Sequence, residues 1–154
     1  MTFKMHTSSP EATRACGVQL GARLTAGSTV ELRSDLGGGK TTFIQGLAQG
    51  LGVTGSVASP TFTLSRVYPL PNGLDFYHFD LYRLSGSDVV IEELADSAGT
   101  PGTITAVEWA DVAGSALPTD RLVITITPLS ETERELTFTA MGPRHEAIIV
   151  GGLS

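Results

Sequence analysis

The sequence predicts an α/β fold, a three-layer sandwich in which helices cover both faces of a mixed parallel and antiparallel sheet. Segments with helical periodicity alternate with short β-rich segments, in the order α-β-α-β-β-α-β-β-β. This alternation is typical of parallel strands, whereas two pairs of closely spaced β segments are typical of antiparallel hairpins. The length of 154 residues predicts one domain, residues 1–154.

The first half of the chain is expected to contain two helices separated by a strand. The first helix begins at Pro10, with Ser9 as its N-cap, because a serine hydroxyl accepts a hydrogen bond from the first turn. A short strand is expected at Thr29–Arg33. A second, amphipathic helix is expected from Lys40 to a glycine cap at Gly52.

The second half is expected to be richer in strands. A turn with the sequence Asn-Gly separates the first two, and alternation of apolar and polar residues indicates a later hairpin. A helix and a further apolar strand lie between the two hairpins. In chain order the expected elements are the strands Phe62–Tyr68 and Leu74–Tyr82, the helix Ser87–Ala98, and the strands Ile104–Trp109, Leu122–Thr127 and Leu136–Ala140.

Composition excludes several classes of protein. The formal net charge is −6 and the pI is about 4.9, so a basic nucleic-acid-binding face is not expected. Cys16 is the single cysteine, which fits a reducing compartment. No apolar run approaches the ~20 residues that span a bilayer, and no signal peptide is evident. We therefore expect a soluble cytoplasmic protein with no membrane segment, a packed core at about residues 9–140 and a short flexible N-terminus.

The most informative segment is a glycine-rich loop between the expected strand and the second helix. It reads Ser-Asp-Leu-Gly-Gly-Gly-Lys-Thr-Thr over residues 34–42. In such a loop the backbone N–H groups converge on phosphate oxygens, so those of residues 36–42 are expected to bind a nucleotide. Lys40 reaches the terminal phosphates and the Thr41 hydroxyl binds Mg²⁺. Ser34 stands where the usual phosphate-loop pattern begins with glycine.

A phosphate loop works with acidic residues at the ends of neighbouring strands. Asp80 and Glu108 each follow an apolar strand, and either is placed to bind Mg²⁺ or orient a water molecule. Thr61, in the segment Ser-Pro-Thr-Phe-Thr, is a candidate for a switch that senses the γ-phosphate. Trp109 follows Glu108 directly. His78 is interpreted as a structural histidine with its hydrogen bonds satisfied.

The chain carries four ordered motifs: Ser-Asp-Leu-Gly-Gly-Gly-Lys-Thr-Thr-Phe (34–43), Ser-Pro-Thr-Phe-Thr-Leu (59–64), Tyr-His-Phe-Asp-Leu-Tyr-Arg-Leu (77–84) and Val-Glu-Trp (107–109). Together they give the chain a clear resemblance to the TsaE family, ATPases with a phosphate loop in bacterial tRNA threonylcarbamoyladenosine biosynthesis. The resemblance covers about residues 9–140, and the family usually has glycine and alanine where this chain has Ser34 and Gly38.

The resemblance implies a fold like that of the phosphate-loop NTPases, ATP or ADP and Mg²⁺ as cofactors, and TsaB and TsaD as partners. In that assembly TsaD transfers the threonylcarbamoyl group to the adenosine 3′ of the anticodon, and ATP hydrolysis resets the complex between turnovers. The tRNA is contacted mainly through the partners. The implied roles are phosphate binding by Leu36, Gly37, Gly38, Gly39, Lys40, Thr41 and Thr42, Mg²⁺ binding by Thr41 and Glu108, catalysis by Lys40, Asp80, Glu108 and Trp109, and contact near the adenine by Glu133 and Arg134.

Two alternatives stay open on the sequence. A small-molecule kinase could use the same loop, but the eight arginines form no cluster after the loop helix like the arginine-rich lid of such kinases. A scaffold that binds ATP without hydrolysing it is also compatible with the motifs. Measuring ATP turnover with and without TsaB and TsaD, together with a screen for phosphorylated acceptors, separates the three hypotheses.

Overall fold

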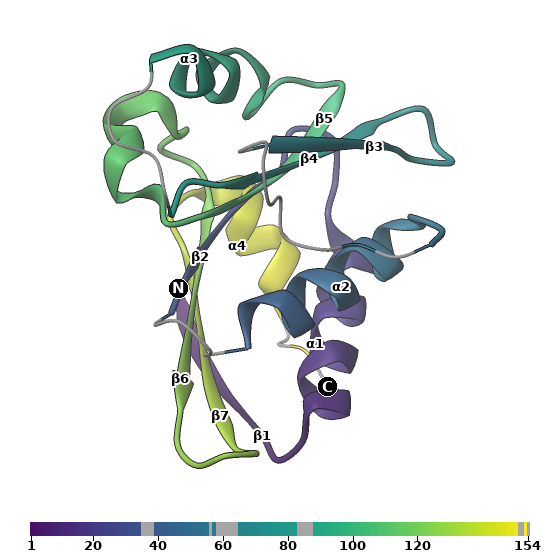
Figure 1. Ribbon diagram of the computed structural model, residues 1–154, viewed down its shortest axis with the longest axis vertical. Coiled ribbons are helices and arrows are strands. Elements are labelled where there is room, and N and C mark those ends of the chain that lie inside the picture. Colours follow the sequence, from purple (N-terminus) through teal and green to yellow (C-terminus); the bar gives the residue numbers. More distant parts are fainter. Residues whose placement is uncertain (35–38, 56, 58–64, 83–87, 151–152, 154) are drawn as a thin grey trace.

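A computed structural model of the chain describes residues 1–34, 39–55, 57, 65–82, 88–150 and 153. Its strands form one seven-stranded sheet in the order β1-β7-β6-β2-β5-β4-β3 (Figure 1). The strands are β1 (Thr2–Thr7), β2 (Thr29–Arg33), β3 (Ser65–Pro69), β4 (Asp75–Asp80), β5 (Thr103–Glu108), β6 (Leu122–Pro128) and β7 (Arg134–Ala140). The helices are α1 (Pro10–Arg23), α2 (Lys40–Leu51), α3 (Asp88–Ser97), the 3₁₀ helix η1 (Ala110–Ala116) and α4 (Pro143–Ile149).

The sheet is mixed, as predicted. At its centre β2 runs parallel to both β5 and β6, and β4 runs parallel to β5. The outer pairs, β1 with β7, β6 with β7 and β3 with β4, are antiparallel. For β3 with β4 and β6 with β7 the direction follows from the short connections that join them, whereas parallel neighbours need a longer crossover. Strands β1 and β7 are distant in the sequence and meet only in the folded sheet.

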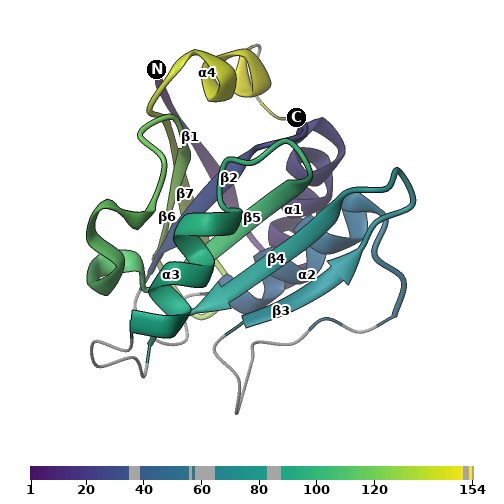
Figure 2. The same ribbon diagram turned by 90° about the horizontal axis from the view of Figure 1, so that it is seen from above.

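Helices cover both faces of the sheet, which confirms the three-layer arrangement. Figure 2 shows α3 on one side of β4 and β5, with α1 and α2 on the other side. Alternate strand residues divide accordingly: Phe76 and Ile104 pack in the core beneath α1 and α2, whereas Phe79 and Val107 pack against α3 and η1. No helix in the described ranges is long and apolar enough to cross a bilayer.

The expectation of a flexible N-terminus is wrong, because residues Thr2–Thr7 form the edge strand β1. This strand pairs with β7 over its whole length, and the Phe3 ring stacks on Phe138 with centroids 4.7 Å apart. Phe3 and Met5 are half-buried and alternate with exposed residues, so the segment has a strand pattern, but one with only two apolar positions.

The core also extends beyond the expected limit at residue 140. Helix α4 follows that point and buries Ile148 and Ile149 in the main core. Its His145 is fully buried, although its sequence surroundings are polar. The His145 ring donates from Nδ1 to the Asp120 carboxylate at 2.6 Å and accepts at Nε2 from the Thr29 backbone N–H at 3.1 Å. These bonds join α4 to the start of β2 and to the segment before β6.

Helices α1 and α2 pack backbone to backbone through glycines spaced four residues apart on each helix. A Cβ atom on Gly46 would lie 2.1 Å from the Arg14 carbonyl oxygen, and one on Gly21 would lie 2.3 Å from that of Leu47. Gly17 and Gly50 make equally close approaches to the opposite helix. This packing leaves no room for a side chain at the contact, and it fixes where α2 lies on the sheet.

Replacing Gly46 by alanine should therefore lower the free energy of unfolding by about 3 kcal/mol, because the helices must separate to admit the methyl group. Gly102→Ala is the matched control, since a Cβ at Gly102 meets no atom within 4 Å. Chemical denaturation of both variants checks the prediction. Equal stability of the two variants would contradict the proposed helix contact.

Burial lowers the pKa of His145, with Asp120 opposing the shift. The unfolded chain then takes up a proton before the folded protein does, so the free energy of unfolding should fall as the pH drops below about 6.5. His145→Gln cannot titrate, so it should flatten this slope and cost about 1–3 kcal/mol at pH 7.5. Denaturation between pH 7.5 and 5 tests this. His6→Gln, an exposed control, should keep the full slope.

Candidate functional site

The carboxyl ends of three parallel strands, β2, β4 and β5, meet beside the N-terminus of α2. The helix starts at Lys40, immediately after Gly39, whose φ of +99° lies in the left-handed region that glycine adopts readily. Ligands of open α/β sheets bind outside the carboxyl ends of the strands, and a helix N-terminus attracts anions. This end of the sheet is therefore the candidate site.

Strand pairing brings the two predicted carboxylates together. Asp80 and Glu108 are register partners in the parallel pair β4–β5, at the last position of each strand. Both lie on the same sheet face as Phe76, because residues two apart share a face. That face is the one covered by α1 and α2, so the carboxylates lie toward the start of α2.

Lys40 is the cation of this site. Its side chain is only 7% exposed, and its Nζ donates to the Ser34 carbonyl oxygen at 3.0 Å. The same ammonium lies 3.8 Å from the centroid of the Trp109 ring, a cation–π contact. Its charge also acts on Asp80. The structure thus groups Lys40 with Asp80, Glu108 and Trp109, the four residues that the resemblance implies for catalysis.

Trp109 has an unusual backbone conformation, with φ 60° and ψ 48°. A left-handed conformation in a residue with a side chain costs about 1–2 kcal/mol, and such strain gathers at functional sites. The Trp109 ring contacts Lys40 and also lies 5.0 Å, centroid to centroid, from the Tyr82 ring. These contacts offset the cost and direct the indole toward the start of α2.

The two carboxylates have different surroundings. Burial and the nearby charge of Glu108 raise the pKa of Asp80, while the N–H of Tyr82 donates to the Asp80 Oδ1 at 3.1 Å. Glu108 is only 2% exposed, and its Oε2 accepts a hydrogen bond from His78 Nε2 at 2.7 Å. His78 is buried, but the expectation that its hydrogen bonds are satisfied is wrong in part: Nε2 bonds Glu108, whereas Nδ1 has no partner among the described residues. The position of His78, two residues before Asp80 on β4, was the available signal for its bond to a site residue.

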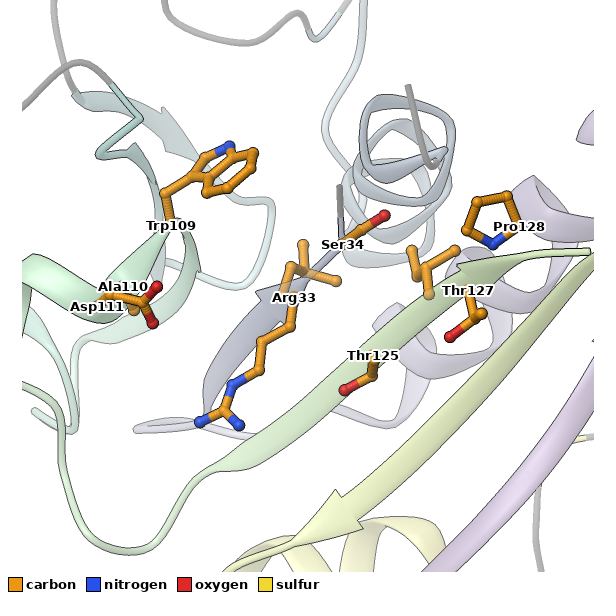
Figure 3. A pocket seen from close by; sticks show the side chains of 10 residues that line it. Arg33, Ser34, Trp109, Ala110, Asp111, Thr125, Thr127 and Pro128 are labelled. Atoms are coloured by element: carbon orange, nitrogen blue, oxygen red, sulfur yellow. The ribbon is translucent and has the colours of Figure 1, made fainter. Parts of the chain in front are cut away.

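A cavity of about 350 Å³ lies over the paired carboxyl ends of β2 and β6, next to Trp109 and the start of η1 (Figure 3). Its wall includes Ser34 and Arg33, and the Arg33 Nε donates to the buried Glu31 carboxylate. Sequence reasoning missed Asp111 and Thr125, which line the same cavity. They belong to η1 and β6, and their approach to β2 depends on the strand order.

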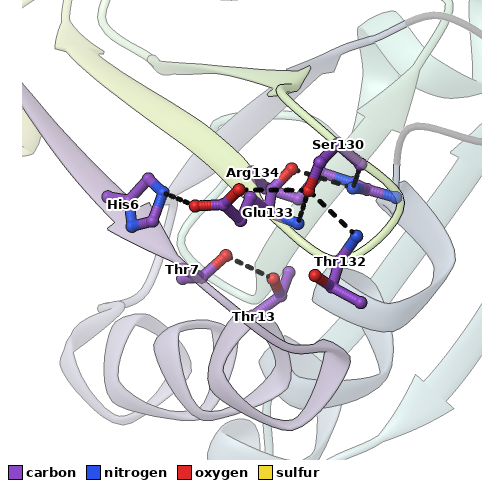
Figure 4. A network of polar contacts seen from close by, with 7 residues as sticks. All are labelled: His6, Thr7, Thr13, Ser130, Thr132, Glu133 and Arg134. Carbon is purple, nitrogen blue, oxygen red and sulfur yellow. Dashed lines mark hydrogen bonds and ion pairs between the residues drawn. The ribbon is translucent and has the colours of Figure 1, made fainter.

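A smaller cavity of about 40 Å³ lies on the other side of the α2 start, lined in part by Gly39, Thr42 and Arg134. Glu133, the neighbour of Arg134, faces away: its carboxylate accepts from the His6 ring at 3.1 Å and from Ser130 at 3.2 Å (Figure 4). Of the two residues expected near the adenine, the structure therefore brings Arg134 to the first turn of α2, and Glu133 to β1.

The remaining predicted residues divide between the described and undescribed parts of the chain. Thr41 is exposed in the first turn of α2. Leu36, Gly37, Gly38 and Thr61 lie outside the described residues. The expected burial of Cys16 is confirmed, and burial raises the pKa of its thiol to about 12, so a thiolate nucleophile is disfavoured there.

Comparison with known proteins gives a consistent result. The family model described as "Threonylcarbamoyl adenosine biosynthesis protein TsaE" matches residues 7–136. The chain is 40% identical over 148 residues to the Bacillus subtilis tRNA threonylcarbamoyladenosine biosynthesis protein TsaE, covering 95% of this chain and 90% of that one. It is 39% identical over 136 residues to the Streptomyces coelicolor protein of that name, covering 85% and 92%. The crystal structure of Bacillus subtilis YdiB superposes with a TM-score of 0.78 and 38% identity, covering 96% and 91%.

Replacing Lys40 by methionine should weaken ATP binding by about 10–100-fold, because it removes a charged donor at the start of α2. It should also change the emission of Trp109, the only tryptophan, because the cation–π contact is lost. Calorimetry and fluorescence check both expectations. Lys4→Met is the control, since Lys4 is exposed and pairs with Glu135. Unchanged ATP affinity in Lys40→Met would contradict the role of this lysine.

Proposed function

The chain belongs to the TsaE family of threonylcarbamoyl adenosine biosynthesis proteins, and from this premise we propose that it binds and hydrolyses ATP in that pathway, together with TsaB and TsaD. The grouping of Lys40, Asp80 and Glu108 at the N-terminus of α2 carries the proposal. One buried cation and two carboxylates at this position suit phosphoryl transfer from a nucleotide to water.

In this proposal the phosphates of ATP bind at the start of α2. The N-terminus of α2 attracts the anion, and Lys40 exchanges its contacts with Ser34 and Trp109 for phosphate oxygens. The small cavity beside Thr42 and Arg134 extends the site away from Trp109, in the direction proposed for the adenosine end of the nucleotide.

The residues fit Mg²⁺ by the chemistry of their donor atoms. The Thr41 hydroxyl and the Glu108 carboxylate are hard oxygen donors of the kind that Mg²⁺ prefers, and we assign the ion to them. The described residues include no group of three or more His, Cys, Asp or Glu placed to hold a metal. Mg²⁺ keeps several water ligands and binds through one or two carboxylates and the substrate phosphates. When bound, the ion neutralises charge on the phosphates.

Asp80 is the residue proposed to act on the attacking water. A carboxylate accepts a proton more effectively as its pKa rises toward the working pH, and burial and Glu108 raise the pKa of Asp80. The hydrogen bond from the Tyr82 N–H holds one of its oxygens in place. Asp80 thus orients the water, while Glu108, on the neighbouring strand, holds the metal.

The site lacks a second mobile cation among the residues that the structure describes. Arg33 and Arg121 both donate to Glu31. Arg134 donates to carbonyl oxygens of its own hairpin. Supplying a positive group in trans is worth about 10³–10⁵ in rate for related enzymes. We therefore propose that TsaB and TsaD complete the site and that hydrolysis allows repeated turnover of the threonylcarbamoyl transfer. The net charge of −6 favours a further proposal, that the partners hold most of the tRNA.

The two carboxylates should give different defects. Glu108→Gln should weaken the Mg²⁺ dependence of ATP binding, because a direct ligand loses its charge. Asp80→Asn should leave ATP binding largely intact and lower turnover by about 100-fold or more, as expected for a group that acts on water. Calorimetry with and without Mg²⁺ and a steady-state ATPase assay separate the two. Identical binding defects in both variants would show that the roles are not divided in this way.

The purified chain alone should be a slow ATPase, and addition of TsaB and TsaD should raise the rate at least about tenfold. Trp109→Ala should reduce this acceleration more than it reduces ATP affinity, since the indole lies beside the site. A phosphate-release assay with and without the partners tests the proposal. Full activity of the isolated chain would overturn the need for partners. ATP binding without turnover in the presence of TsaB and TsaD would favour the scaffold hypothesis. Transfer of phosphate to a small acceptor would favour the kinase hypothesis.

A further inference from the structure

The buried pair of His78 and Glu108 carries an inference that rests on the proposed function. We propose that His78 is a positioning residue, which holds the Glu108 carboxylate in the orientation in which it binds Mg²⁺. The two side chains are 0% and 2% exposed, and His78 Nε2 lies 2.7 Å from Glu108 Oε2. Among the described residues, His78 makes the hydrogen bond to this carboxylate.

The surroundings of the ring determine which nitrogen carries the proton. His78 Nδ1 is buried and has no hydrogen-bond partner among the described residues. A proton on Nδ1 would be a buried donor without an acceptor, which is energetically costly. The neutral tautomer with its proton on Nε2 avoids this cost and donates to the carboxylate. The ring is therefore oriented to serve Glu108 alone.

Strand register places His78 behind the carboxylate. His78 pairs with Ala106 on β5, two residues before Glu108, so its ring lies one step further from the carboxyl end of the sheet. The hydrogen bond occupies Oε2 from the interior of the sheet. The other carboxylate oxygen, Oε1, accepts no bond from a described residue and is left for a ligand at the carboxyl end.

A purely structural role explains this histidine poorly. The Phe76 ring lies parallel to His78, with centroids 6.4 Å apart, in the aromatic middle of β4. An apolar side chain of similar volume would pack there without burying a half-satisfied ring. Metal-binding carboxylates, by contrast, depend on hydrogen-bonded partners that fix their rotamer, and loss of such a partner typically costs 10–100-fold in metal affinity. The histidine therefore serves the site at some cost to the core.

The test compares His78→Leu, which removes the donor at similar volume, with His78→Gln, whose amide nitrogen takes the place of Nε2. ATP affinity is measured by calorimetry in EDTA and as a function of Mg²⁺ concentration, with denaturant unfolding in parallel. His78→Leu should raise the Mg²⁺ concentration for half-maximal effect about 10–100-fold, with ATP affinity in EDTA retained and with some loss of stability, because the buried Glu108 carboxylate is left without its donor. His78→Gln should restore the parent Mg²⁺ dependence. Combined with Glu108→Gln, His78→Leu should add no further loss.

His78→Asn provides the comparison with His78→Gln if the leucine variant fails to fold. Its amide is too short to reach Glu108, so it should show the same Mg²⁺ defect while remaining polar. Parent Mg²⁺ dependence in His78→Leu or His78→Asn, together with a loss in Glu108→Gln, would overturn the positioning role and leave the proposed function intact. Parent Mg²⁺ dependence in Glu108→Gln would overturn the metal assignment in the proposed function, and the inference with it.

Discussion

The site depends above all on the compensation of one buried charge. Lys40 is only 7% exposed, and its ammonium group requires partners because burial of an isolated charge is very costly. The Ser34 carbonyl and the Trp109 ring are two of these partners, and the charge of Lys40 also acts on the Asp80 carboxylate. The left-handed backbone conformation of Trp109 serves this contact, because it brings the indole over the Lys40 ammonium. A phosphate ligand would take over the compensation, so the resting contacts and the proposed ligand compete for one cation.

The scaffold holds this charge in place from two directions. Backbone contact between α1 and α2, which Gly46 and its counterparts permit, sets where α2 begins on the sheet. Parallel pairing of β4 with β5 brings Asp80 level with Glu108, one step beyond His78. The contact between α1 and α2 tolerates little displacement because it has no space for a methyl group. The pairing of β4 with β5 tolerates little because strand register fixes it. The geometry of the site is therefore a consequence of the core packing beneath it.

Much of this arrangement could be predicted from the sequence, for physical reasons that differ between elements. The strand at Thr29–Arg33 and the helix from Lys40 match the structure because the glycine-rich loop marks their limits. Asp80 and Glu108 could be placed because acids at the ends of apolar strands are a local pattern. Strand β1 and the burial of His145 could not be predicted in this way. Strand β1 depends on pairing with β7, and the burial of His145 depends on its contacts with Thr29 and Asp120. The role of His78 required the register between two strands separated by α3.

The most direct test of the central claim is a crystal structure with Mg²⁺ and a non-hydrolysable ATP analogue. Our account predicts the phosphates at the N-terminus of α2, with Lys40 moved from the Trp109 ring to phosphate oxygens and the ion on Thr41 and Glu108. It would be contradicted by a nucleotide bound elsewhere, for example in the cavity of about 350 Å³ over the carboxyl ends of β2 and β6, with Lys40 still over Trp109.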